Sequence, residues 1–329
     1  MRSRSVALLL LVLLAGFAAV IQVQRLSRQS RWEEACGEGR VLTVKEGLQE
    51  QPFGEREVER ESDGRAWRPW GDLGVSGCGR YETRFGRGLP RVPLLSFPCS
   101  GNTWLRYLLE GASGVFTGSE FADEELLRAG FLGEGEDPDS GRTLVQKSHG
   151  SVDKSGHDLV SRHDAVDPRA PAVLLLRDPR KAIISFWKLL SQPGDGRHTV
   201  QLSLKDFQSN AFRGHVERMT SLWEELATDR LLWNSAPLLV LHYERLVADP
   251  LGCLRELLRF LGVAVDEGRL RCVAAQLEGS FKRSGNEDFD PYTLEEKRRF
   301  SLAVERVQRL LKLTGHSDPP LYEWQSDLL

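Results

Sequence analysis

The sequence lacks the features on which several large classes of protein depend. Its 44 lysines and arginines stand against 47 aspartates and glutamates, and a net charge of −3 argues against a general nucleic-acid binder. Its seven histidines show no metal-ligand spacing, so no metal site is expected, and no internal repeat is found. What remains is a chain of 329 residues, 40% of them apolar, which is enough for one large α/β domain with appendages.

Only one long apolar run is present, over residues 6–23. Eighteen helical residues span about 27 Å, close to the thickness of a bilayer core. Arginines flank the run on both sides, so charge is weak evidence of orientation. A membrane anchor is the favoured interpretation, and a signal peptide cleaved after Gly16 or Ala18 is the alternative.

The most informative stretch reads Ser-Phe-Pro-Cys-Ser-Gly-Asn-Thr-Trp over residues 96–104. A short apolar run precedes it and predicts a buried strand, and a helical pattern follows. A strand, a loop containing glycine and a helix N-terminus together form an anion site, because the first amides of a helix have no internal partner. Asn102 and Thr103 add side-chain donors. The loop lacks the spacing and the lysine of G-x-x-x-x-G-K-[ST], which disfavours an ordinary Walker nucleotide loop.

This stretch resembles the 5′-phosphosulfate loop of sulfotransferases, Pro-Lys-Ser-Gly-Thr-Thr-Trp. In this sequence asparagine replaces a threonine, and Cys99 stands where the lysine belongs. A strand-to-helix turn with a buried tryptophan is the alternative interpretation. The resemblance implies that the sulfate donor is bound by Ser100, Gly101, Asn102, Thr103 and Trp104.

A second element follows the apolar run at 173–176. Pro179 suits the first position of a helix with Asp178 as its N-cap, and Arg177 can direct two N–H donors at a phosphate. Ser185 lies eight positions after Arg177. The segment resembles the sulfotransferase 3′-phosphate element, against the alternative of a surface arginine and a helix serine in an ordinary αβ unit. Together the two elements imply 3′-phosphoadenosine 5′-phosphosulfate (PAPS) as the donor.

A short strand predicted at 144–147 leads into Lys147-Ser148-His149, which is similar to the Lys-Thr-His of cytosolic sulfotransferases. The histidine of that family is the general base, and an imidazole titrates near neutrality. The resemblance makes His149 and Lys147 catalytic candidates. A surface histidine and a carboxylate base, with Asp153 the nearest, remain open as alternatives.

Two later segments also fit the family. Residues 242–251 resemble its Tyr-Glu-Asp-Leu…Asp-Pro segment, which implies that Tyr243 lies near adenine, although a core role is equally open. Residues 278–283 match a late segment whose aromatic ring stacks on adenine and whose cations close over the 3′-phosphate; a solvated basic pair is the alternative. The implied donor-binding residues here are Phe281, Lys282 and Arg283.

The sequence resembles most the WSC-domain-containing sulfotransferases, a group linked to O-sulfation of sialic acid, which also lacks the loop lysine. The resemblance covers roughly residues 91–313, and the Cys-rich WSC modules are not found. It implies a P-loop-like α/β fold with a central parallel sheet flanked by helices at 91–329. The expected organisation is a cytoplasmic tail at 1–5, a transmembrane signal anchor at 6–23 and a luminal stem at 24–90.

The expected function is transfer of a sulfuryl group from PAPS to a glycan hydroxyl, on a glycoprotein or glycolipid, with sialic acid one candidate. The expected location is the Golgi membrane, single-pass type II. Two alternatives stay open: a Golgi pseudoenzyme that binds nucleotide or glycan without transfer, and a P-loop kinase of a small metabolite. A homodimer is also open.

The pattern of β-then-α segments predicts a parallel sheet. Lys147 or Arg106 could replace the missing loop cation, and the acidic loop at 121–142 is expected on the acceptor side. Cys253 and Cys272 are candidates for a disulfide. The predicted strands are 92–96, 144–147, 172–177 and 238–242, and the predicted helices are 102–113, 179–190, 213–228, 250–261, 266–277 and 293–313.

Overall fold

The computed structural model describes residues 53–54, 56–62, 64–70, 77–153, 162, 167–192, 202–279, 289–322 and 324. Its strands are β1 (Pro93–Ser96), β2 (Gly118–Ser119), β3 (Gln146–Ser148), β4 (Ala172–Leu176) and β5 (Leu238–His242). Its helices are α2 (Asn102–Ser113), α3 (Glu124–Arg128), α5 (Pro179–Leu190), α6 (Leu204–Gln208), α7 (Asn210–Trp233), α8 (Tyr243–Ala248), α9 (Pro250–Phe260), α10 (Glu267–Ala274), α11 (Leu294–Leu313) and the 3₁₀ turn η1 (Gly150–Asp153).

The strands form one sheet in the order β2-β3-β1-β4-β5, and every pairing is parallel. Alternate side chains of β1, β4 and β5 enter opposite hydrophobic clusters: in β1, Leu94 joins one cluster and Leu95 the other. A strand buried on both faces reads as a continuous apolar run, which is why these runs predicted a parallel sheet. The predicted α/β fold with a central parallel sheet and flanking helices is confirmed.

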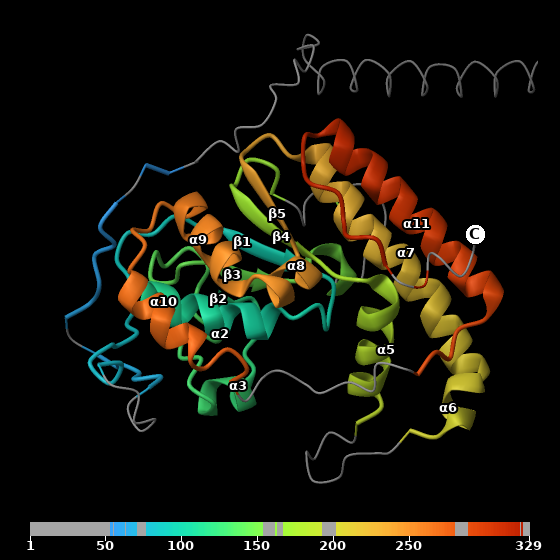
Figure 1. Ribbon diagram of the computed structural model, residues 1–329, viewed down its shortest axis with the longest axis horizontal. Coiled ribbons are helices and arrows are strands. Elements are labelled where there is room, and N and C mark those ends of the chain that lie inside the picture. Colours follow the sequence, from blue (N-terminus) through green and yellow to red (C-terminus); the bar gives the residue numbers. More distant parts are fainter. Residues whose placement is uncertain are drawn as a thin grey trace, which may run out of the picture. The chain divides into compact units, whose positions relative to one another are not determined.

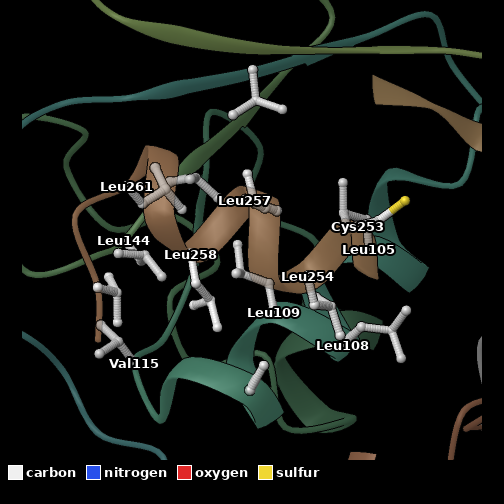
Figure 2. Packing of buried hydrophobic residues seen from close by; sticks show 14 of the residues in the cluster. Leu105, Leu108, Leu109, Val115, Leu144, Cys253, Leu254, Leu257, Leu258 and Leu261 are labelled. Atoms are coloured by element: carbon white, nitrogen blue, oxygen red, sulfur yellow. The ribbon is translucent and has the colours of Figure 1, made fainter. Parts of the chain in front are cut away.

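Helices cover both faces of the sheet (Figure 1). Helices α2, α9 and α10 lie on one face, and α5, α7 and α11 lie on the other. Figure 2 shows two leucines of α9 directed at those of α2, with Leu254 and Leu258 facing Leu108 and Leu109. Burying a leucine contributes about 1.5–3 kcal/mol, so this contact holds α2 and α9 together.

The helix boundaries follow local signals in the sequence. Helix α2 ends at Gly114, whose φ of 71° is the left-handed conformation that glycine adopts freely. Asp178 caps α5 by accepting a hydrogen bond from Arg180 N at 2.9 Å, as predicted. Thr293 forms the predicted capping box with Glu296 at the start of α11.

Part of the segment predicted as a stem packs against this domain. Trp70 is buried against α2 and makes an edge contact with Tyr81, with ring centroids 6.0 Å apart. The predicted Cys253–Cys272 disulfide is wrong, because Cys272 is bonded to Cys78 across 194 residues and Cys253 is a buried thiol. Cys78 reaches α10 at a Cα–Cα distance of 5.8 Å, which suits a disulfide.

The predicted anchor at 6–23 lies outside the described residues. Within the described ranges, no helix is both long and apolar enough to cross a membrane.

Candidate functional site

The candidate site lies at the carboxyl edge of the sheet. The strand register pairs Leu95 with Ser148, Ser96 with Leu175, and Leu176 with His242, so four neighbouring strands end close together. The residues that follow those strand ends are Phe97, His149, Arg177 and Tyr243. Three of them are predicted site residues, and Phe97 opens the predicted donor loop. Ligands of open α/β sheets gather at this edge.

The donor loop, residues 97–101, turns sharply between β1 and α2. Cys99 has a φ of 61° and Gly101 a φ of 91°, both in the left-handed region. Gly101 is the N-cap of α2 and supplies no side-chain cap, so no capping side chain occupies the helix N-terminus. Ser100 is fully buried, and its hydroxyl has no hydrogen-bond partner among the described residues. A buried hydroxyl without a partner next to a helix N-terminus fits an anionic ligand.

Two predicted binding residues hold the loop from beneath. Asn102 is buried, and its Nδ2 donates to Leu94 O at 3.2 Å and to Ser96 Oγ at 3.0 Å. Trp104 is buried, and its Nε1 donates to Leu277 O at 2.7 Å. Both side chains connect the loop to the rest of the domain. Thr103 lies at the second position of α2 and is partly exposed.

Tyr243 packs on the donor loop. A Cβ at Gly101 would lie 2.5 Å from Tyr243 Cε2, so only glycine fits beneath the ring. The guanidinium of Arg177 stacks on the ring of Tyr243, 4.4 Å from the ring centroid. The Trp104 ring meets Tyr243 edge-on at 5.9 Å. Tyr243 therefore joins the two predicted phosphate elements.

Arg177 follows β4 and reaches back to the donor loop, where its Nη1 donates to Cys99 O at 2.6 Å. Its Nε is buried and has no partner among the described residues, so a donor remains for a ligand. The backbone around it is held on both sides: Trp223 Nε1 donates to Arg177 O at 3.1 Å, and Asp178 N donates to Glu244 Oε1 at 2.9 Å. Burial raises the pKa of Asp178 and that of Glu244.

His149 is pinned to the strand that leads into the donor loop. Its Nδ1 lies 2.7 Å from Ser96 O. A carbonyl oxygen can only accept, so Nδ1 carries the proton and Nε2 is the basic nitrogen. Burial, together with the charge of Lys147, lowers the pKa of His149 to about 4. The imidazole is therefore neutral at physiological pH, the form that a general base requires.

The residues proposed to replace the loop lysine differ in their surroundings. Arg106 is fully buried, pairs with Glu134 and donates from Nε to Thr117 Oγ1 at 2.8 Å, so the suggestion that it replaces the lysine is wrong. Its guanidinium serves a buried network that includes Glu110, whose pKa burial raises to about 7. Lys147 lies two residues before His149, the predicted base, with its Nζ 5.1 Å from the Phe121 ring centroid.

Phe121 opens the loop predicted on the acceptor side. Its ring centroid lies 5.2 Å from that of the His149 imidazole, so the start of that loop lies beside the predicted base. Ser185 is on α5, and its hydroxyl donates to Lys181 O at 2.7 Å within the same helix. The side chain of Asp153 and the predicted ligands Phe281, Lys282 and Arg283 lie outside the described residues.

Sequence reasoning missed the residues that hold the site together. Ser96, Trp223 and Glu244 act through a backbone carbonyl, an indole N–H and a buried carboxylate. Glu244 lies within the motif at 242–251, so the sequence offered a signal for it. Trp223 has the hydrophobic pattern of any core position of α7, so the sequence offered none. Over the described stretches of chain, no group of three or more His, Cys, Asp or Glu side chains could hold a metal ion.

Comparison with known proteins places the chain in a family. Residues 89–301 match the family described as Sulfotransferase domain, and since the match covers well over half of the chain, the chain belongs to this family. It is 38% identical over 208 residues to a WSCD family member of Drosophila pseudoobscura pseudoobscura, covering 61% of this chain and 60% of that protein. A WSCD family member of Drosophila melanogaster is 35% identical over 216 residues, 63% of this chain and 62% of the relative.

The chain thus spans somewhat over half the length of these curated relatives. Among solved structures, mouse sulfotransferase SULT7A1 complexed with PAP aligns with 68% of this chain and 86% of its own, at 13% identity and a TM-score of 0.44. That score is too low for the likeness to bear on activity. The predicted sulfotransferase family, close to the WSC-domain-containing group, is confirmed.

Proposed function

We propose that the chain is a PAPS-dependent sulfotransferase that acts on a hydroxyl acceptor. One observation carries the proposal: the donor loop, Arg177 and a neutral His149 follow three adjacent strands at one edge of the sheet. A phosphate-binding helix N-terminus, a phosphate-binding cation and a base are the three groups that the reaction needs. Family membership supports the same reading.

The donor side fits a ligand with two separated anionic groups. The uncapped N-terminus of α2 and the buried hydroxyl of Ser100 suit the 5′-phosphosulfate. Arg177, whose Nε lacks a partner among the described residues, suits the 3′-phosphate. Tyr243 lies between them and offers its ring to the nucleoside.

The acceptor side supplies the proton transfer. As the acceptor oxygen forms its bond to sulfur, the bond from sulfur to the phosphate oxygen breaks, and the electron pair leaves with adenosine 3′,5′-bisphosphate. Nε2 of His149 accepts the hydroxyl proton, because Nδ1 is committed to Ser96 O. A general base typically contributes about 10²–10⁴ in rate.

A second candidate function is nucleotide binding without transfer. The observation that favours it is Cys99, which stands where the family loop has its lysine, while Arg106 is committed to Glu134 and Thr117. A cation on the bridging oxygen stabilises the charge of the leaving group. Without one, the donor site would bind well and react slowly.

The decisive experiment measures binding and transfer on the same protein. Calorimetry with adenosine 3′,5′-bisphosphate tests the donor site, and radiolabelled sulfate transfer from PAPS onto a glycan panel tests the reaction. Arg177→Ala should weaken binding roughly ten- to a hundredfold, the value of a charge-assisted contact. His149→Ala should bind normally and transfer at least about a hundredfold more slowly.

Each outcome separates the candidates. Donor binding without transfer by the wild type supports the second candidate. Mg²⁺-dependent turnover of ATP would favour a kinase. Transfer by His149→Ala at more than about a third of the wild-type rate would place the base elsewhere, and Asp153→Asn is then the next variant.

We further propose a glycan acceptor in the Golgi lumen. The Cys78–Cys272 disulfide supports an oxidising compartment, where such bonds persist. The apolar run at 6–23 supports a type II anchor. Protease treatment of intact Golgi vesicles should leave everything beyond residue 23 undigested. Digestion of the domain without detergent would show that the chain has the opposite orientation.

A further inference from the structure

The segment that follows α11 returns to the carboxyl edge of the sheet. His242 Nε2, at the end of β5, lies 3.0 Å from Ser317 O. Tyr322 and Trp324 are buried with 4% and 5% of their surface exposed, and the Trp324 ring meets Phe300 of α11 at 6.2 Å. Tyr322 and Trp324 therefore belong to the packed domain, although the sequence after α11 has no strand or helix pattern.

The indole of Trp324 forms a hydrogen bond with Asp178, the residue that follows Arg177. Its Nε1 donates to Asp178 Oδ2 at 3.1 Å, across 146 residues of chain. The other carboxylate oxygen, Oδ1, accepts from Arg180 N at 2.9 Å and caps α5. Both oxygens thus accept from N–H donors, and Asp178 is only 3% exposed, so the carboxylate has one orientation.

The contact completes a cage around the backbone of Arg177 and Asp178. Trp223 holds the Arg177 carbonyl, Glu244 holds the Asp178 amide, and Trp324 holds the Asp178 side chain. These three residues come from α7, α8 and the segment after α11. A long side chain such as arginine binds a phosphate well only when its backbone is held in place.

We propose that Trp324 is a positioning residue for Arg177, so that the segment after α11 sets the affinity for the 3′-phosphate of the donor. The inference rests on the proposed function, in which Arg177 binds that group. Trp324 acts through Asp178 and touches no ligand itself. Its removal should therefore affect ligands that carry a 3′-phosphate and spare those that lack one.

The test compares two nucleotides on the purified full-length chain. Calorimetry measures the affinities for adenosine 3′,5′-bisphosphate and for adenosine 5′-monophosphate, and their ratio reports the 3′-phosphate contact. Trp324→Phe keeps a ring and removes the N–H donor. We expect it to lower the ratio about tenfold, the order of one hydrogen bond to a charged group. Leu321→Ala, in the same segment and 81% exposed, is the matched control and should leave the ratio unchanged.

A second variant guards against a simple folding defect. Asp178→Asn keeps an oxygen for Arg180 N and turns an NH₂ group towards the indole N–H, so it breaks the same bond from the other side. The double variant should then lose no more than either single one. An equal loss of affinity for both nucleotides, or an additive double variant, would show that Trp324 only stabilises the domain and would overturn the inference.

A failure of the proposed function can be distinguished from a failure of the positioning role. If Arg177→Ala leaves the ratio of the two affinities unchanged, Arg177 does not bind the 3′-phosphate. If Arg177→Ala lowers the ratio and Trp324→Phe does not, the donor site stands and the positioning role is wrong.

Discussion

The pKa of His149 gives the sharpest prediction, because it links the proposed base to folding stability. Burial and the charge of Lys147 lower this pKa from 6.5 to about 4 in the folded chain. The perturbation is His149→Gln, which keeps a side-chain N–H able to donate to Ser96 O and removes the titrating group. The free energy of unfolding is then measured at two pH values.

The sign follows from proton binding. Between about pH 4 and pH 6.5 the unfolded chain protonates this histidine and the folded chain does not. Stability from this group is therefore complete above pH 6.5 and is lost as the pH falls through that window. At pH 7 the effect is near zero, and at pH 5 it amounts to about 2 kcal/mol.

Urea unfolding at pH 7 and at pH 5, with wild type and variant side by side, measures this difference. Other titrating groups, such as Glu110, occur in both proteins and cancel in the comparison. Between pH 7 and pH 5 the wild type should lose about 2 kcal/mol more than His149→Gln. Equal losses would mean that the imidazole titrates normally and is not buried. The same shift predicts that sulfate transfer shows no acid limb near pH 6.5.

Three further predictions follow from single contacts. Gly101→Ala should weaken adenosine 3′,5′-bisphosphate binding roughly tenfold or more in calorimetry, because its Cβ would meet the Tyr243 ring at 2.5 Å; unchanged affinity would refute this packing. Cys272→Ser should lower the free energy of unfolding in urea by about 2–4 kcal/mol, and reductant should do the same to the wild type; no change in either case would mean that the bond to Cys78 does not form. Cys99→Lys should raise the transfer rate at saturating donor, and an unchanged rate would mean that another cation already acts there.

The regular elements were largely predictable from local sequence. The apolar runs predicted β1, β4 and β5 to within a residue, and the capping signals at Asp178 and Thr293 located the starts of α5 and α11. The elements that escaped prediction are the short ones: β2 has two residues, η1 four, α3 and α6 five each, and α8 six. Elements of this size depend on tertiary contacts, because a single turn of helix or a pair of strand residues has little stability of its own.

The candidate site was predictable as a set of residues and less so as an arrangement. Gly101, Arg177, Tyr243 and His149 were predicted from motifs, and the structure brings them to one edge. That Arg106 serves Glu134 and Thr117 instead of the donor loop was not predictable, since a buried arginine and a ligand-binding arginine look alike in sequence. The pairing of Cys272 with Cys78 was equally invisible, because a spacing of 194 residues says nothing about proximity.

By itself the sequence determined the family, the parallel α/β class and the residue types of the donor loop, because these follow from local pattern and short motifs. Only the tertiary structure decided which strands flank β1. That order places His149 on one side of the donor loop and Arg177 on the other. Strand order depends on packing between distant segments of chain, and so does the contact of Trp324 with Asp178 across 146 residues. Neither the strand order nor this contact can be predicted from a local stretch of residues, so the site is assembled only when the chain folds.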